Sequence, residues 1–253
     1  MLDRTFIHVP RIGPAAERKL WESGYLSWSQ CLADPAAIPL GPAARKSLEV
    51  TLPESVEALG RRDSRYFARQ LPAREHWRAA RSFRRVGYLD IETDGGINVT
   101  VIGLYDGVRV RQYVRGDNLD IFPEEIESCD LLVTFFGSGF DIPMLRRCFP
   151  GIPLDVLHID LCHALHRLGF KGGLKAIEAS VGIRRSADTI GLGGWDAVRL
   201  WQEYLRGSEE SLSILLAYNA EDIINLEPLL DIAYEGLSRK LDLLGTRGSG
   251  LAV

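Results

Sequence analysis

The segment from Val86 to Thr93 constrains the fold and chemistry of this chain more than any other. Its apolar and aromatic residues lie between an arginine-rich stretch and a Gly95-Gly96 break, a pattern that predicts a strand. Side chains two positions apart on a strand point to the same face, so Asp90 and Glu92 project together. Adjacent carboxylates repel each other, and a divalent cation such as Mg²⁺ or Mn²⁺ relieves that repulsion. The rest of the chain is therefore expected to bring further carboxylates to this pair.

The composition is that of an ordinary globular protein. The chain has 253 residues, 46% of them hydrophobic and 25% charged, which suffices for a sizeable core. The formal net charge of -4 disfavours coating of nucleic acid by bulk charge but permits local basic patches. The four cysteines show no CxxC spacing and are interpreted as reduced thiols. The sequence shows neither a signal-peptide core nor an apolar run long enough for a membrane span, so a cytoplasmic protein is expected.

Residues 1–60 are predicted to form a small all-α module. A turn at Ile12-Gly13-Pro14 leads into a helix that Gly24 is suited to end. The pattern resembles a helix-hairpin-helix module, whose hairpin offers backbone N–H groups to a nucleic-acid phosphate. Arg11 and Gly13 are the candidate contacts. The alternative is a Gly-Pro turn within a helical bundle that has no role in binding.

Residues 61–83 are predicted to form an arginine-rich linker helix. Nine arginines lie between positions 61 and 85, with aromatic residues among them, and only two acidic residues oppose them. Arginine favours bidentate phosphate contacts and stacks on bases, so we expect this segment to contact nucleic acid. The alternative is a solvated helix that packs its aromatic residues onto the next domain. The candidate nucleic-acid-binding residues are Arg65, Arg69, Arg74 and Arg78.

Residues 84–245 are predicted to form an α/β domain with a mixed sheet flanked by helices, followed by a flexible tail at 246–253. The first three strands are expected at residues 86–91, 98–105 and 108–114, with a hairpin turn at Asp106-Gly107. Further along the chain, we expect a buried strand at 130–135, another element starting at 158–161, and helices at 175–181, 196–205 and 211–230.

Three more residues join the acidic pair as candidates. Asp141 follows an apolar strand at a turn, and Asp222 lies in the last long helix, four residues after Tyr218 and on the same helix face. With Asp90 and Glu92, the set supplies four carboxylates, which can hold two divalent ions about 3.5–4 Å apart for in-line phosphoryl displacement. One ion would activate a water, the other would stabilise the leaving oxygen, and Tyr218 would orient the attacking water.

The order of these motifs resembles that of the DEDD 3′–5′ exonucleases, in which the tyrosine marks the DEDDy branch. Residues 88–93, 174–178 and 218–222 are similar to the YprB-type ribonuclease H-like exonucleases, and the resemblance covers roughly residues 75–235. It implies a ribonuclease H-like fold, two Mg²⁺ or Mn²⁺ ions, and 3′–5′ hydrolysis of single-stranded DNA or RNA. It also implies that Tyr218 is catalytic and that the metal ligands are Asp90, Glu92, Asp141 and Asp222.

One position departs from that pattern. Many relatives carry Asn four residues before the Phe of the Phe-Asp motif, where this chain has Phe136, and loss of the amide would affect substrate positioning or metal affinity. Two alternatives use the same residues: a non-catalytic nucleic-acid-binding protein on an exonuclease scaffold, and a structure-selective endonuclease. A zinc site is disfavoured because the spacing of its possible ligands fits no standard motif: His158, Cys162, His163 and His166.

Overall fold

The computed structural model describes residues 1–245, and the predicted flexible tail at 246–253 lies outside the described residues. The chain divides into two compact units. The first comprises residues 1–84, 155–157 and the described residues from 234 onward; the second comprises residues 85–154 and 158–233. Among the described residues, none of the helices combines the length and the apolar character that crossing a bilayer requires.

The N-terminal part of the first unit is all-α, as predicted. Pro14 and Pro42 stand in the first turns of their helices, where the missing N–H costs nothing. Gly24 adopts a left-handed conformation (φ 89°) just after the first helix ends. The resemblance to a helix-hairpin-helix module stays a prediction. The elements are η1 (Leu2–Arg4), α1 (Pro14–Glu22), α2 (Trp28–Ala33), α3 (Pro42–Gly60), α4 (Ser64–Gln70) and η2 (Ala73–Ala79).

The arginine-rich segment contains two short helices, and the prediction of one continuous linker helix is wrong. α4 ends at Gln70, and Leu71 is extended, with φ −78° and ψ 138°. The cause is Pro72, because a proline disfavours helical geometry at the residue before it and has no N–H to continue the hydrogen-bond ladder. η2 begins directly after it, at Ala73.

A closed network of charged groups lies in the core of the first unit. The Arg78 side chain is 3% exposed and donates from Nε to Glu75 at 2.8 Å. Its Nη1 donates to both oxygens of Glu17 at 2.9 Å and to the Thr5 hydroxyl at 2.6 Å. Glu17 also accepts from the Phe6 N–H at 2.6 Å. Every charge in this network therefore has a partner of opposite sign, as burial requires.

The second unit is built on a five-stranded mixed sheet with strand order β3-β2-β1-β4-β5, which confirms the predicted α/β class. β1 pairs antiparallel with β2 and parallel with β4, and β2 pairs antiparallel with β3. β1 therefore lies in the middle of the sheet, buried between neighbours on both sides. The strands are β1 (Val86–Thr93), β2 (Val99–Tyr105), β3 (Val110–Val114), β4 (Leu131–Thr134) and β5 (Leu157–Asp160).

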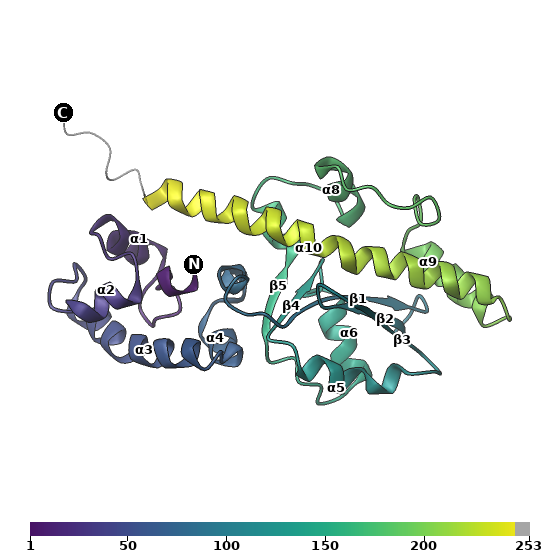
Figure 1. Cartoon of the computed structure of the whole chain (residues 1–253), viewed down its shortest axis with the longest axis horizontal. Helices are drawn as coiled ribbons and strands as arrows, with labels where there is room; N and C mark the ends of the chain where they lie inside the picture. The colour runs from purple at the N-terminus through teal and green to yellow at the C-terminus, as the bar shows by residue number, and fades with distance from the viewer. Residues whose placement is uncertain (246–253) are drawn as a thin grey trace. The chain divides into compact units, whose positions relative to one another are not determined.

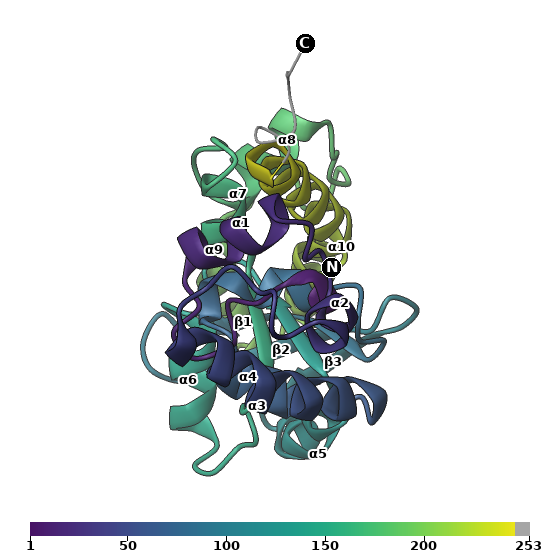
Figure 2. The same cartoon turned by 90° about the vertical axis from the view of Figure 1, so that its left-hand side faces the viewer.

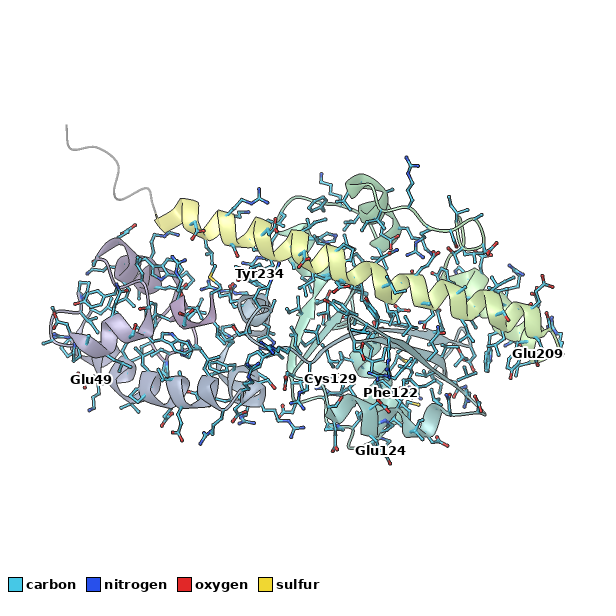
Figure 3. The ribbon with its side chains drawn as sticks, in the orientation of Figure 1. Glu49, Phe122, Glu124, Cys129, Glu209 and Tyr234 are labelled. Carbon is cyan, nitrogen blue, oxygen red and sulfur yellow. The ribbon has the colours of Figure 1, made fainter. Side chains whose placement is uncertain are left out.

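Helices cover both faces of this sheet (Figures 1 and 2). α5 (Phe122–Glu127) and α6 (Asp141–Cys148) lie on one side, and α8 (Leu174–Val181), α9 (Gly194–Tyr204) and α10 (Glu209–Gly245) lie on the other. η3 (Leu119–Ile121) precedes α5, and α7 (Leu161–His166) follows β5. Figure 3 shows Phe122 on the sheet side of α5 and Glu124 on its outer side. An apolar cluster joins α9 and α10 to the sheet through Val101, Val114, Leu200, Trp201, Leu215 and Tyr218.

The start of β3 and the end of the last helix are among the element boundaries that differ from the prediction. β3 begins at Val110 and not at 108, because the Asp106 carboxylate accepts from the N–H groups of Val108 (2.9 Å) and Arg109 (2.8 Å) and extends the turn. The last helix runs to Gly245, well past the predicted end at 230. It continues through Pro228, whose ring removes a single backbone donor.

Candidate active site

Three carboxylates from distant parts of the sequence converge at the centre of the sheet. Asp90 and Glu92 lie on β1 and Asp222 lies on α10, and one oxygen atom of each lies within 4.8 Å of the others. Glu92 and Asp222 are buried, and Asp90 is half-buried. Hard oxygen donors in a set this compact fit a magnesium or manganese ion. The predicted alternation along β1 explains the shared face of Asp90 and Glu92.

The electrostatics of the cluster favour a cation. Burial raises the pKa of Asp90 well above its ordinary value, and the charges of Asp222, Glu92 and Asp141 raise it further. Burial also raises the pKa of Glu92, with Asp222 as the next cause. The pKa of Asp222 is raised by burial, while the Arg185 guanidinium acts in the opposite direction. Each carboxylate resists ionisation chiefly because it is buried, and neighbouring carboxylates add to the effect at Asp90 and Glu92. A divalent ion would offset that penalty.

Asp141, the fourth predicted ligand, lies beside the cluster at the first position of α6. It is 3% exposed, and its Oδ1 accepts the backbone N–H of Ile91 at 3.1 Å. Burial raises the pKa of this carboxyl group to about 7. The hydrogen bond ties the start of α6 to the middle of β1, between the two strand carboxylates. One Asp141 oxygen is thereby committed to the backbone.

An amide relay across the sheet fixes the Asp90 carboxylate. The buried Asn219 side chain donates to Asp90 Oδ2 at 3.1 Å and accepts from Gln112 Nε2 at 3.1 Å. Gln112 also donates to the Leu216 carbonyl at 2.7 Å, which secures it to α10. Gly103 pairs with Asp90 across β1 and β2 and lies beneath Asn219. A Cβ atom at Gly103 would lie 2.2 Å from Asn219 Oδ1, so only glycine leaves room for the relay.

Tyr218 is held by Lys175. The Lys175 Nζ donates to the Tyr218 hydroxyl at 2.7 Å and also to the Leu192 carbonyl. Burial raises the pKa of Tyr218, and the charge of Asp222 raises it further. Burial lowers the pKa of Lys175. Tyr218 therefore keeps its proton at neutral pH, and its hydroxyl is suited to donating a hydrogen bond and not to acting as a base.

Arg185 is a site residue that the sequence did not reveal. Its side chain is 6% exposed and donates to both oxygens of Glu178 at 2.7 Å. It also donates to Asp222 Oδ1, one of the three clustered carboxylates. The residue lies in the irregular segment between α8 and α9 and belongs to no motif, so periodicity gave no signal. Glu221, which precedes Asp222 on α10, accepts the N–H of Ser186 in the same segment.

Asp160 fixes the turn that precedes Asp141. Its carboxylate accepts the N–H groups of Phe136 (2.9 Å) and Ser138 (3.0 Å), and it also caps α7 through the Cys162 N–H (3.1 Å). Phe136 has φ 63°, a left-handed conformation that a bulky residue adopts only when its surroundings impose it. The residue is 51% exposed. Phe136 is thus an exposed aromatic residue on a turn that Asp160 holds in place.

The predicted nucleic-acid contacts divide into two groups. Arg78 is buried in the charge network of the first unit, so its assignment as a phosphate contact is not supported. The remaining candidates have exposed side chains or backbone: Arg11, Gly13, Arg65, Arg69 and Arg74. Among the described residues, the possible zinc ligands do not assemble into a metal-binding group, and His158 instead hydrogen-bonds to Thr134 at 2.8 Å.

Comparison with known proteins gives one family. The RNase_H_2 model, described as RNase H superfamily, matches residues 87–234, more than half of the chain. A search of curated proteins found no match. A structure of the family B DNA polymerase from the hyperthermophilic archaeon Pyrobaculum calidifontis is similar, with a TM-score of 0.45 and 15% sequence identity. The similarity covers 66% of this chain and 27% of the polymerase, so the chain spans about a quarter of that protein's length.

Proposed function

Because the chain belongs to the RNase H superfamily, we propose that it is a metal-dependent nuclease that hydrolyses phosphodiester bonds in nucleic acid. The observation that carries this proposal is the convergence of Asp90, Glu92 and Asp222 within 4.8 Å on a buried sheet centre. Three neighbouring carboxylates with raised pKa values, two of them buried and only partly offset by Arg185 and Lys175, are unfavourable in their ionised forms unless a metal ion joins them.

Each residue of the site has a proposed part in the reaction. Asp90, Glu92 and Asp222 are the metal ligands, with Asp141 as a fourth carboxylate, and two ions are proposed. Bound divalent ions would supply charge stabilisation and a more acidic water. Asn219 holds the Asp90 carboxylate in one orientation. Tyr218, fixed by Lys175, donates a hydrogen bond that orients the attacking water.

The finer proposal is 3′–5′ exonuclease action on single-stranded DNA or RNA. Its support is the order of the acidic motifs together with Tyr218, four residues before Asp222. Exposed aromatic rings at Phe136 (51%) and Phe140 (41%) lie on the turn that leads to Asp141. Such rings stack on unpaired bases without regard to sequence. In this proposal Phe136 provides by stacking the positioning that an asparagine provides in many relatives.

We propose that the first unit contributes phosphate contacts through Arg11, Gly13, Arg65, Arg69 and Arg74. These positions are exposed, and Gly13 leaves open space at the start of α1. Replacing Arg65 and Arg69 together by alanine should weaken single-strand binding and reduce its salt dependence by about one to two phosphate contacts. Fluorescence anisotropy over a series of salt concentrations measures both effects. An unchanged salt slope would remove these two arginines from the interface.

The experiment that tests the function uses the purified full chain with single-stranded DNA and RNA labelled at the 5′ end, with Mg²⁺ or Mn²⁺ added. A ladder of shortening products that EDTA abolishes is expected. Asp222→Asn should abolish the ladder, whereas Glu210→Gln, an exposed acid on the same helix, should leave it intact. A single internal cut would favour the structure-selective endonuclease. Tight binding without cleavage under either metal would favour the non-catalytic binding protein.

A further inference from the structure

The buried ion pair between Arg185 and Asp222 bears on how tightly the acidic cluster can bind a metal ion. Asp222 belongs to the three-carboxylate set and simultaneously accepts from the Arg185 guanidinium. Both side chains are buried, at 9% exposure for Asp222 and 6% for Arg185. The Arg185 guanidinium and a metal ion bound by the cluster would therefore compete for the negative charge of Asp222.

Glu178 anchors Arg185 independently of the cluster. It is 2% exposed, and it holds the guanidinium through two bonds of 2.7 Å. Glu178 also accepts a hydrogen bond of 3.0 Å from the side-chain amide of Asn225, which lies one turn beyond Asp222 on α10. If Arg185 loses its contact with Asp222, its charge keeps a buried partner in Glu178. The guanidinium is therefore retained next to the cluster whichever way Asp222 is engaged.

The guanidinium is not saturated by these partners. Its Nη1 is buried and lacks a hydrogen-bond partner, whereas Nη2 serves both Glu178 and Asp222. An unsatisfied buried donor is unfavourable, so the position is less firmly determined than one with a complete set of bonds. Arg78 in the first unit has matched partners on both Nε and Nη1, by contrast. The bond from Nη2 to Asp222 is therefore the contact with which a divalent cation would compete.

We propose that Arg185 is an internal counter-ion that neutralises Asp222 and competes with a divalent metal ion for it. The inference rests on the proposed function, because it assumes that Asp90, Glu92 and Asp222 bind metal. Arg185 permits the acidic cluster to fold before an ion arrives, and the ion then takes over the Asp222 charge while Glu178 retains the arginine. The consequence is a site whose metal affinity is lower than its carboxylates alone would give.

The test is calorimetric titration of Mn²⁺ into the full chain and two variants at pH 7.5 and low salt. Arg185→Gln should bind Mn²⁺ at least about tenfold more tightly than the parent, because a unit charge next to the ligand set is removed. Without Mn²⁺ it should melt at a lower temperature, since Glu178 and Asp222 lose their counter-ion. Arg199→Gln removes the same charge from an exposed pair with Glu203, 2.8 Å apart, and should change neither quantity.

A paired substitution guards against a variant that fails to fold. Arg185→Met with Glu178→Gln removes Arg185 together with its anchor, so Glu178 does not stay buried without a partner and only Asp222 loses a counter-ion. This double variant should also bind Mn²⁺ more tightly than the parent. Weaker binding in both variants would overturn the proposal and make Arg185 a positioning residue for Asp222. Unchanged affinity would also overturn it and reduce the ion pair to a structural contact.

The two levels of the proposal fail differently. If the parent chain binds no Mn²⁺ and Asp222→Asn gives the same trace, the metal site and the counter-ion role are both wrong. If the parent binds Mn²⁺, Asp222→Asn abolishes binding and Arg185→Gln has no effect, the proposed metal site stands and only the counter-ion role is wrong.

Discussion

The two units of this chain bury charged groups in opposite ways. In the first unit, Arg78 contacts Glu17 and Glu75 directly, and further donors from Thr5 and Phe6 complete the set around Glu17. In the second unit, Asp90, Glu92 and Asp222 face one another, and Arg185 and Lys175 offset only part of their charge. Burial is similar in the two places, so the difference lies in charge matching.

The difference in charge matching indicates a structural role for the charged groups of the first unit and a metal-binding role for those of the second. A buried ion network in which both carboxylates contact the same arginine needs no further cation to be held in place, and it is best explained as a fixed support for the helices around it. A buried cluster of like charges is unfavourable in itself, and such clusters are typical of metal and catalytic sites. The density of arginines predicted nucleic-acid binding in the first unit, whereas Arg78 is buried and contacts Glu17 and Glu75.

The largest expected effect is on catalysis in the second unit. Asp90→Asn should lower the rate of metal-dependent cleavage at least about 1,000-fold, because several kcal/mol of transition-state stabilisation depend on the ion. Its stability without metal should be equal to or above that of the parent, since one of the mutually repelling charges is gone. Cleavage assays and urea denaturation measure the two. A large loss of stability would show that Asp90 is needed for folding.

The reverse is expected for the network in the first unit. Arg78→Met should reduce the free energy of unfolding by about 3–5 kcal/mol, because Glu17 and Glu75 remain buried without their counter-ion. Arg74→Met, at a side chain that is 70% exposed, should cost less than about 0.5 kcal/mol. Urea denaturation compares the two. Equal stabilities would mean that the buried arginine is no more important than its exposed neighbour.

A pH effect is expected from the same unit. Burial lowers the pKa of His8 from 6.5 to about 4, with the Arg78 charge as a second cause. Between these values the unfolded chain binds a proton that the folded protein does not, so stability falls as the pH falls through this window, by up to about 3 kcal/mol. Denaturation curves at pH 7 and pH 4.5 measure the loss. His8→Gln should flatten the dependence, and an unchanged slope would assign it to other groups.

The smallest of these effects concerns the amide relay. Gly103→Ala should weaken Mn²⁺ binding about 10- to 100-fold, because the new Cβ displaces Asn219 from Asp90. Gly116→Ala is a control at an open position with a left-handed φ of 85°, where backbone strain arises away from the relay. Calorimetric titration measures the affinities. If both variants bind Mn²⁺ as the parent does, the relay does not control the site.

Local periodicity predicted much of the second unit. The two-residue repeat of a strand placed Asp90 and Glu92 on one face, and the four-residue helical spacing placed Tyr218 beside Asp222. The start of β3 at Val110 was missed because a side-chain cap decided it. Periodicity cannot state that β1 and α10 meet, so that expectation came from the need of the strand carboxylates for further metal ligands and from the family resemblance.

The residues that were missed act through tertiary contacts. Arg185 lies in an irregular segment, and its partner Asp222 is 37 positions away. Gly103 offered an available signal, since a glycine inside an apolar strand indicates close approach of another group. Arg78 could not be distinguished from the other arginines, because its burial depends on Thr5 and Glu17, 73 and 61 positions away.

Asp90, Glu92 and Asp222 are proposed to form a metal site because their charges are not balanced within the protein. The most direct test of this proposal is urea denaturation of the parent chain and Asp222→Asn, each with and without Mn²⁺ at pH 7.5. An ion that binds only the folded cluster should stabilise the parent by about 2.7 kcal/mol at an ion concentration 100 times the dissociation constant. Asp222→Asn should show little or none of this gain. Equal stabilisation of both proteins, or of neither, would contradict the assignment of these carboxylates as the metal site.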